Sequence, residues 1–280
     1  MKGIAYLGPR GTYSHEAATI WGQRAGQDSF LACPDLPGVL AAVLQGQAAA
    51  AILPVENSIE GAVNLTLDLV LENPELQVIG EVVLPVHHCL ISRAGDLATI
   101  REVWSHPQAL AQCRHYLAQN LPGVITRPAT STAAAADQAR QQPYLAAIAS
   151  NFAAEVYQLP VLAAGIEDYP DNKTRFWVLG RENLHLPGPY KTSLVVAAVA
   201  NRPGSLYAIL KDFAAAGINL TRIESRPTKQ ELGEYLFFID CEGRATEPPL
   251  REVLVGLKAK TSLLSILGSY ARDGGGTSGQ

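Results

Sequence analysis

Residues 3–26, GIAYLGPRGTYSHEAATIWGQRAG, join a short apolar run to a helical pattern, and this unit sets the fold class. GIAYL is typical of a buried strand, and SHEAATIWGQRAG predicts a helix that Ser14 can cap. The loop between them, GPRGTYS, can present backbone N–H groups to an anion. It has neither the Lys-Ser/Thr ending of a P-loop nor the full glycine fingerprint of a dinucleotide site, so we do not expect nucleotide binding.

The alternation of strand and helix continues to about residue 180. Further strand patterns are SFLAC (29–33), AAAILPV (49–55), LQVIGEVVLPVHHCLISR (76–93), EVWSH (102–106), GVIT (123–126) and LAAIA (145–149). Helical patterns lie between them at about 35–45, 107–120 and 131–141. Such alternation indicates βαβ units and mainly parallel sheets covered by helices. Because two similar blocks follow each other, we expect an α/β domain with two lobes around a cleft.

The pattern changes after residues 181–190, a stretch with two prolines and a glycine that we interpret as a linker. Residues 191–271 predict the order βαββαβ of a ferredoxin-like module, with its second helix near 247–259. A stripe of apolar residues with helical spacing marks the first helix: Leu206, Ile209, Leu210 and Phe213. We therefore predict domains at 1–180 and 191–271, followed by a polar, disordered tail at 272–280.

The composition of the 280 residues is that of an ordinary globular protein, with a net charge of −4 and a pI near 5.9. This charge provides no basic surface for nucleic acid. The four cysteines lie far apart and form no C-x-x-C pair, which argues against a zinc site or a redox motif. The chain begins without a signal-peptide pattern and has no apolar stretch near the ~20 residues that span a bilayer, so we expect a cytoplasmic protein that does not bind membranes.

Polar residues gather in DNKTRFWVLG, residues 171–180, immediately before a buried type of strand. Asp171 and Asn172 favour a turn, and an arginine such as Arg175 can extend its charged end to solvent. The apolar run that follows nevertheless draws Thr174 and Arg175 towards the interior, where a guanidinium can bind a carboxylate through two parallel hydrogen bonds. From these residues alone, a surface turn and a ligand site both stay open.

Several motifs occur in an order that resembles one enzyme family: YLGPRGTYSHEAA, LPVENSIEGAVNLTLD, HPQALAQC, STAAAA, AAIAS and IEDYPDNKTRFWVLG. The first 180 residues resemble prephenate dehydratase. Residues 191–271 resemble an ACT regulatory domain, in which GSLYAIL and ESRP match two segments implicated in phenylalanine binding. The resemblance implies the monofunctional form, because no chorismate mutase segment precedes Met1. It also implies a two-lobed catalytic domain similar to the type II periplasmic-binding-protein fold.

The resemblance implies a carbon–oxygen lyase that converts prephenate to phenylpyruvate, CO2 and water in L-phenylalanine biosynthesis. Thr174 and Arg175 are then the catalytic residues, with Thr174 as a positioned donor to the leaving hydroxyl and Arg175 on a substrate carboxylate. The other expected substrate-binding residues are Thr12, Glu56, Asn57, Ser58, Ser131, Thr132 and Phe176. Helix capping is the structural alternative for Asn57 and Ser58, and also for Ser131 and Thr132.

The ACT resemblance implies allosteric control by L-phenylalanine, with inhibition as the expected sign. The expected effector-binding residues are Gly204, Ser205, Leu206, Asn219, Leu220, Glu224 and Ser225. A plain helix cap and a strand end are the structural alternative for these two segments. Because ACT modules pair with one another, the resemblance also implies a homodimer or homotetramer.

Two other functions stay open. Arogenate dehydratase performs the same chemistry on an amino acid substrate, and a solute-binding protein also has two α/β lobes around a cleft. No cofactor is expected, since aromatisation drives the elimination without an electron sink. No metal is expected either, because the histidines lack ligand spacing such as H-E-x-x-H and are interpreted as structural: His15, His87, His88, His106 and His115.

Overall fold

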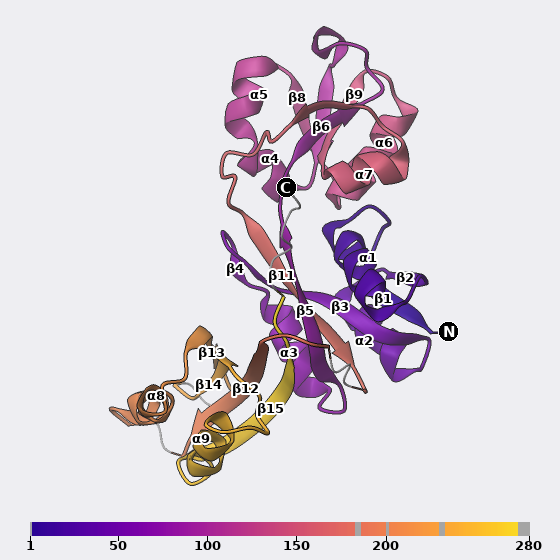
Figure 1. Cartoon of the computed structure of the whole chain (residues 1–280). Coiled ribbons are helices and arrows are strands. Elements are labelled where there is room, and N and C mark those ends of the chain that lie inside the picture. The colour runs from indigo at the N-terminus through magenta and orange to yellow at the C-terminus, as the bar shows by residue number, and fades with distance from the viewer. Residues whose placement is uncertain (1, 183–185, 200–201, 230–232, 274–280) are drawn as a thin grey trace. The chain divides into compact units, whose positions relative to one another are not determined.

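The computed structural model describes residues 2–182, 186–199, 202–229 and 233–273. The chain packs as two units, the first made of Met1–Thr66 and Val82–Phe176 and the second of Leu67–Glu81 and Trp177–Gln280 (Figure 1). Most of the tail predicted to be disordered lies outside the described residues, as does the middle of the predicted linker.

The first sheet and its helices continue the strand–helix pattern of the N-terminus. Its elements are β1 (Gly3–Leu7), α1 (Tyr13–Ala25), β2 (Phe30–Cys33), α2 (Leu36–Leu44), β3 (Ala48–Asn57), β4 (Gly61–Ala62), α3 (Asn64–Glu72), β5 (Gln77–Pro85) and β11 (Lys173–Gly180). The strand order is β2-β1-β3-β11-β5, with β4 paired to β3. β1 pairs in parallel with both β2 and β3, as expected for βαβ units.

The second sheet has the order β10-β6-β9-β7-β8. Its elements are β6 (Cys89–Ser92), β7 (Glu102–Ser105), α4 (Pro107–Gln112), α5 (Arg114–Asn120), β8 (Ile125–Pro128), α6 (Thr132–Gln141), β9 (Leu145–Ala149), α7 (Asn151–Tyr157) and β10 (Val161–Ala164). β7 is parallel to β8 and β9, but β6 is antiparallel to β9 and β10. The prediction of mainly parallel pairing is therefore wrong for half of these pairs, because the chain enters this sheet along β6 and leaves it along β10.

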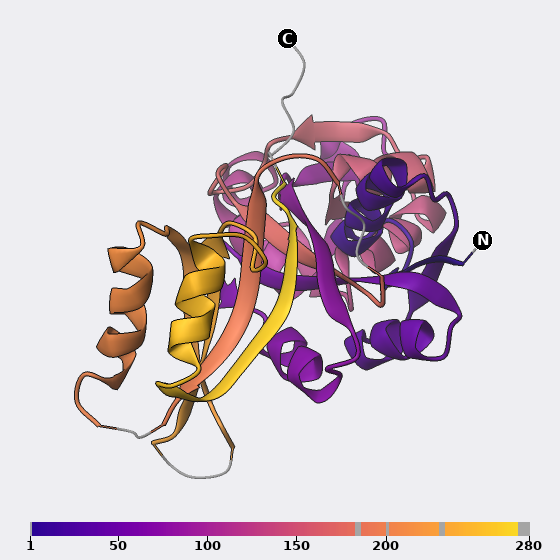
Figure 2. The same ribbon diagram turned by 60° about the horizontal axis from the view of Figure 1, so that its bottom comes forward.

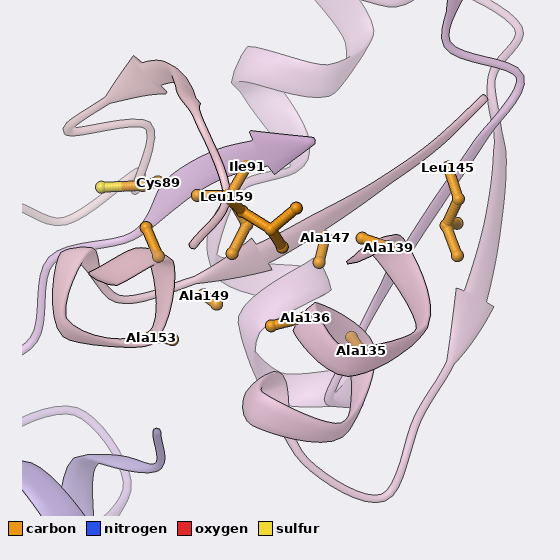
Figure 3. Close-up of a cluster of buried hydrophobic side chains, with 11 residues drawn as sticks. Cys89, Ile91, Ala135, Ala136, Ala139, Leu145, Ala147, Ala149, Ala153 and Leu159 are labelled. Atoms are coloured by element: carbon orange, nitrogen blue, oxygen red, sulfur yellow. The ribbon is translucent and has the colours of Figure 1, made fainter. Parts of the chain in front are cut away.

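Small side chains form the core between the second sheet and α6. Ala135, Ala136 and Ala139 of α6 are fully buried and project towards Ala147 and Ala149 of β9 (Figure 3). Both facing surfaces carry alanine, whose side chain is small, so the helix can lie close to the sheet. This close approach supports the N-terminal end of α6, which contributes to the site described below.

Local signals for helix ends were less reliable than those for the helices themselves. Thr12, and not Ser14, caps α1, because its backbone is extended and its side chain accepts from the His15 N–H. The helix predicted at 107–120 is interrupted at Cys113, whose backbone (φ −120°, ψ 17°) separates α4 from α5. The helix expected from residue 247 begins only at Leu250, after two prolines.

The C-terminal sheet has the order β13-β14-β12-β15 and the predicted βαββαβ connectivity. Its elements are β12 (Tyr190–Ala198), α8 (Ser205–Ala215), β13 (Leu220–Pro227), β14 (Tyr235–Glu242), α9 (Leu250–Leu257) and β15 (Thr261–Ala271). All three strand pairs are antiparallel. The two helices lie side by side and share one core with the sheet (Figure 2).

Residues 67–81 pack with this C-terminal sheet, although they precede it by more than a hundred residues. Both carboxylate oxygens of Glu81 accept from Nζ of Lys191 at 2.9 Å, and both side chains are buried. A Cβ on Gly268 of β15 would overlap the backbone of Val78, so only glycine allows this approach. These contacts tie β5 to the C-terminal sheet.

Candidate functional site

A cavity of about 750 Å³ lies in the first unit. The loop after β1, the end of β3 and the start of β11 contribute to its lining, together with the N-terminal ends of α4 and α6. In α/β proteins, ligands collect beyond the carboxyl ends of strands, where loops from neighbouring units meet. We therefore take this cavity as the candidate active site.

Thr174, near the start of β11, lines the cavity with its hydroxyl held by an amide. Asn57 Nδ2 donates to Thr174 Oγ1 at 2.9 Å, and Asn57 Oδ1 accepts from the backbone N–H groups of Ile59 and Glu60 at 3.0 Å each. These backbone donors fix which end of the amide faces Thr174. The threonine oxygen is therefore an acceptor, and its O–H is left to donate. Within the described chain, no hydrogen bond joins Thr174 to a histidine or a carboxylate.

Asn172 lies two residues before Thr174 and is only 2% exposed. Its Oδ1 accepts from Asn57 Nδ2 at 2.9 Å and from Ser58 Oγ at 3.2 Å, while its Nδ2 donates to Gln112 Oε1 at 3.4 Å. Although the sequence suggested a turn residue, Asn172 is a buried side chain of the cavity wall. It connects the polar groups after β3 with those at the end of α4.

A second polar group of the wall consists of Gln112, His88 and Tyr13. Gln112 Oε1 lies 3.0 Å from His88 Nε2, and His88 Nδ1 lies 3.2 Å from the Tyr13 hydroxyl, which donates to the His87 carbonyl oxygen at 2.7 Å. Burial lowers the pKa of His88 and raises that of Tyr13 well above its usual range. Both side chains are thus neutral at pH 7.

Arg175 and Phe176 follow Thr174 on β11 but are not among the described residues that line the cavity. Side chains alternate along a strand, so Arg175 projects from the face opposite to Thr174. Its Nη1 lies 3.5 Å from Glu56 Oε2, and the residue is 8% exposed. Phe176 is buried in the core. The expected contact between Arg175 and a substrate carboxylate therefore stays a prediction.

The N-terminal end of α6 points at the cavity through Ser131 and Thr132. Ser131 caps the helix, because its Oγ accepts from the Ala134 N–H at 2.9 Å, and its own hydrogen can still donate to a ligand. Thr12 also lines the cavity. Its hydroxyl caps α1, and its hydrogen faces the carbonyl oxygens of Leu7 at 2.9 Å and Pro9 at 3.1 Å, so this hydrogen is already engaged.

The structure thus brings five of the predicted substrate-site residues to one cavity: Thr12, Asn57, Ser131, Thr132 and Thr174. Ser58 reaches it through Asn172, whereas Glu56, Arg175 and Phe176 lie outside its lining among the described residues. Sequence reasoning missed the roles of Gln112 and Tyr13 in the wall. For Gln112 a signal existed, since a glutamine three residues after Ala109 continues the buried face of a short helix.

The second unit has a smaller cavity of about 470 Å³ where β12 ends and α8 and β15 begin. Gly204 and Ser205 from the predicted effector set line it, together with two cationic residues, Arg202 and Lys260. The described lining does not include the other predicted effector residues, which stay predictions: Leu206, Asn219, Leu220, Glu224 and Ser225.

Among the described residues, no group of three or more His, Cys, Asp or Glu side chains is placed to hold a metal ion. A helix long and apolar enough to cross a membrane does not occur in the same part of the chain. The four cysteines are all buried as free thiols.

The fold and the cavity define a two-lobed α/β enzyme with a C-terminal ACT domain. The sequence profile described as "Prephenate dehydratase" matches residues 4–184, and that described as "ACT domain" matches residues 192–258. A curated relative from Amycolatopsis methanolica, named "Prephenate dehydratase", is 44% identical over 278 residues, which are 98% of this chain and 90% of that protein. The chain belongs to the prephenate dehydratase family, whose members are lyases that release water and CO2.

Several solved structures match nearly the whole chain, among them the following two. A crystal structure of prephenate dehydratase in complex with L-Phe from Arthrobacter aurescens is 38% identical, has a TM-score of 0.86 and covers 98% of this chain and 91% of its own. A structure described as GqqA, a novel type of quorum quenching acylase, is 34% identical and has a TM-score of 0.85. The match covers 97% of this chain and 98% of that one. The domain limits predicted at 180 and 191 stay predictions.

Proposed function

We propose that the cavity binds prephenate and that Thr174 assists the departure of its C4 hydroxyl. The ring C–OH bond breaks as this oxygen, which accepts a hydrogen bond from Thr174, takes up a proton supplied by solvent and leaves as water. The electrons of the bond to the ring carboxylate enter the ring as CO2 departs, which leaves phenylpyruvate. The observation that carries this proposal is the hydrogen bond from Asn57 to the Thr174 oxygen, because it leaves the threonine O–H to donate to a ligand.

A threonine hydroxyl is a weak acid, so it acts here as a positioned donor. By donating to Thr174 Oγ1 at 2.9 Å, Asn57 withdraws electron density from that oxygen and strengthens its O–H as a donor. General acid assistance of this kind is typically worth about 10²–10⁴-fold in rate. The remaining acceleration comes from orientation of the ring and from the fixed dipoles of the cavity wall.

The two substrate carboxylates need positive potential in a chain whose net charge is −4. We assign one carboxylate to the N-terminal end of α6, where Ser131 and Thr132 line the cavity and backbone N–H groups point outward. We assign the other to Arg175, whose guanidinium must turn from Glu56 towards the cavity to reach it.

An absorbance assay for phenylpyruvate tests the function directly. Purified protein without added metal or nucleotide is expected to produce phenylpyruvate from prephenate, and to act less well on arogenate, whose ammonium group replaces the ketone. Faster turnover of arogenate would assign the enzyme to the alternative substrate. Amide hydrolysis, the reaction of an acylase, is not favoured by the geometry. Thr174 accepts a hydrogen bond from an amide nitrogen and makes none to a base that could activate it as a nucleophile.

We infer that L-phenylalanine regulates the enzyme through the ACT domain. The related structure that contains L-Phe supports this assignment, as does the cavity at Gly204 and Ser205. Inhibition is the expected sign for a pathway product, and a typical coupling is ~1–3 kcal/mol. We also propose a homodimer or homotetramer formed through the ACT domains, since paired domains can change their arrangement when the effector binds.

A charged contact offers a route for this coupling within the second unit. Asp68 of α3 accepts from Arg226 Nη2 at 3.1 and 3.2 Å and from Lys229 Nζ at 2.8 Å. Burial opposes ionisation of Asp68, but the hydrogen bonds from Lys229 and Arg226 outweigh it and lower its pKa. Arg226 belongs to the ESRP segment. Along the chain, α3 follows the end of β3 at Asn57 and the short β4, so this contact links the predicted effector strand to the helix that comes after the site residues.

Asp68→Asn is expected to weaken phenylalanine inhibition while leaving turnover without phenylalanine nearly unchanged. The half-inhibitory concentration should rise by about 5- to 50-fold, within the usual range of allosteric coupling. Glu102→Gln is a matched control, because it removes a carboxylate of similar exposure from another arginine pair, with Arg127. An Asp68→Asn enzyme with an unchanged inhibition curve would contradict this route, although calorimetric binding of phenylalanine would still support the effector assignment.

A further inference from the structure

In the hydrogen bonds around the cavity, backbone N–H groups determine which side-chain atoms donate and which accept. Because the N–H groups of Ile59 and Glu60 occupy Asn57 Oδ1, the amide nitrogen of Asn57 must donate on its other side. It has two acceptors at 2.9 Å, Thr174 Oγ1 and Asn172 Oδ1. The orientation of one amide thus determines the orientation of the next.

Asn172 transmits this direction across the cavity wall. The hydroxyl of Ser58 accepts from the Lys173 N–H at 2.9 Å, so its own hydrogen goes to Asn172 Oδ1 at 3.2 Å. With Oδ1 occupied by two donors, the amide nitrogen of Asn172 faces Gln112 Oε1 at 3.4 Å. Asn172 is 2% exposed, so these hydrogen bonds are largely shielded from solvent.

The same direction reaches the histidine at the other end of the wall. Gln112 Oε1 accepts from Asn172, so the His88 Nε2 that lies 3.0 Å away must carry a hydrogen. In a neutral imidazole Nδ1 then carries no hydrogen, and the Tyr13 hydroxyl shares its hydrogen between Nδ1 at 3.2 Å and the His87 carbonyl oxygen at 2.7 Å. Neutrality agrees with the burial that lowers the pKa of His88.

We propose that Asn172 is a positioning residue for the reaction. The backbone sets which end of the Asn57 amide faces Thr174, and Asn172 Oδ1 accepts the second N–H of that amide and so holds its plane, which keeps the first N–H on Thr174 Oγ1 and the Thr174 O–H free for the substrate. This inference rests on the proposed donor role of Thr174. Only an asparagine-like side chain supplies the required acceptor towards Asn57 and Ser58 together with a donor towards Gln112. A leucine removes both groups, whereas an ionised aspartate keeps the acceptor but places an oxygen against Gln112 Oε1.

The first test compares Asn172→Leu in two backgrounds. In the wild-type background it is expected to lower kcat by about 10- to 100-fold, as misplacement of a reacting group does, with KM changed less than about threefold. In a Thr174→Ala background the same substitution should change kcat by less than about threefold, because the group that Asn172 positions is gone. Thermal unfolding of each variant checks that the comparison is made on folded protein.

The second test uses Asn172→Asp and does not depend on a large substitution being tolerated. A protonated carboxyl group has one acceptor oxygen and one O–H donor, which reproduces the two sides of the amide. Activity of this variant should therefore rise by at least about fivefold as pH falls from 8 to 5, relative to wild type at the same pH. A role in packing alone would give no such relative change.

Each outcome distinguishes this proposal from the donor role on which it rests. Wild-type kcat in Thr174→Ala overturns both. If Thr174→Ala is strongly defective, the donor role stands, and two results would still overturn the Asn172 proposal. One is wild-type kcat in Asn172→Leu, and the other is a double variant in which the effects of the two substitutions multiply. A flat relative pH profile of Asn172→Asp also overturns it, since the direction of the hydrogen bonds would then have no effect on turnover.

Discussion

Thr174→Ala is expected to lower kcat for prephenate by about 10²–10⁴-fold, the range of general acid assistance, while KM changes much less. The hydroxyl contributes mainly in the transition state, when the departing oxygen gains negative charge and accepts its hydrogen more strongly. The measurement is the rate of phenylpyruvate formation at saturating prephenate. Only the side chain of residue 174 is shortened, so the rest of the cavity stays as it is in the wild type.

Two further substitutions separate the hydroxyl from the shape of the side chain. Thr174→Val keeps the β-branched form that suits β11 and removes only the hydroxyl, so it should be as slow as Thr174→Ala. Thr174→Ser keeps the hydroxyl and should retain more activity than either. If folded Thr174→Val turns over at the wild-type rate, the donor role is wrong, and the bond from Asn57 serves structure alone.

The architecture followed from patterns that act over short distances. Strand and helix periodicity predicted the α/β lobes and the βαββαβ module, because side chains repeat every second residue in a strand and every third or fourth in a helix. Pairing direction in the second sheet did not follow, since nothing local in the residues of β6 shows that it is the strand by which the chain enters that sheet. The packing of residues 67–81 with the C-terminal sheet could not be predicted either, because the buried Glu81–Lys191 pair joins residues far apart in sequence.

The site was predicted in part for a similar physical reason. Asn57, Ser131 and Thr174 follow strands or precede helices, and the carboxyl ends of strands are where ligands gather in such folds. The role of Asn172 in the site could not be predicted, because asparagine also favours turns. Only the folded chain shows that this residue is 2% exposed and lies between Asn57 and Gln112. Adjacent residues on β11 were expected to act together, but strand alternation separates Thr174 from Arg175.

Arg175→Lys is expected to lower kcat/KM by about 10- to 150-fold, which corresponds to losing a charge-assisted hydrogen bond of about 1.5–3 kcal/mol. Lysine keeps the charge but not the planar fork that binds a carboxylate through two parallel hydrogen bonds. Arg175 is nearly buried beside Glu56 Oε2 at 3.5 Å, so its guanidinium must either turn to the substrate or act through Glu56. Steady-state kinetics with prephenate give KM and kcat separately.

Glu56→Gln decides between these two actions of Arg175. If the guanidinium binds a substrate carboxylate, Glu56 competes for it, so removing the Glu56 charge should lower KM or leave it unchanged, while Arg175→Lys raises KM. If Arg175 only holds Glu56 in place, Glu56→Gln should reproduce the defect of Arg175→Lys, and the double variant should be no worse than either single one. Equal kcat/KM for Arg175→Lys and wild type would contradict the bidentate contact altogether, because a point charge at that position would then be sufficient.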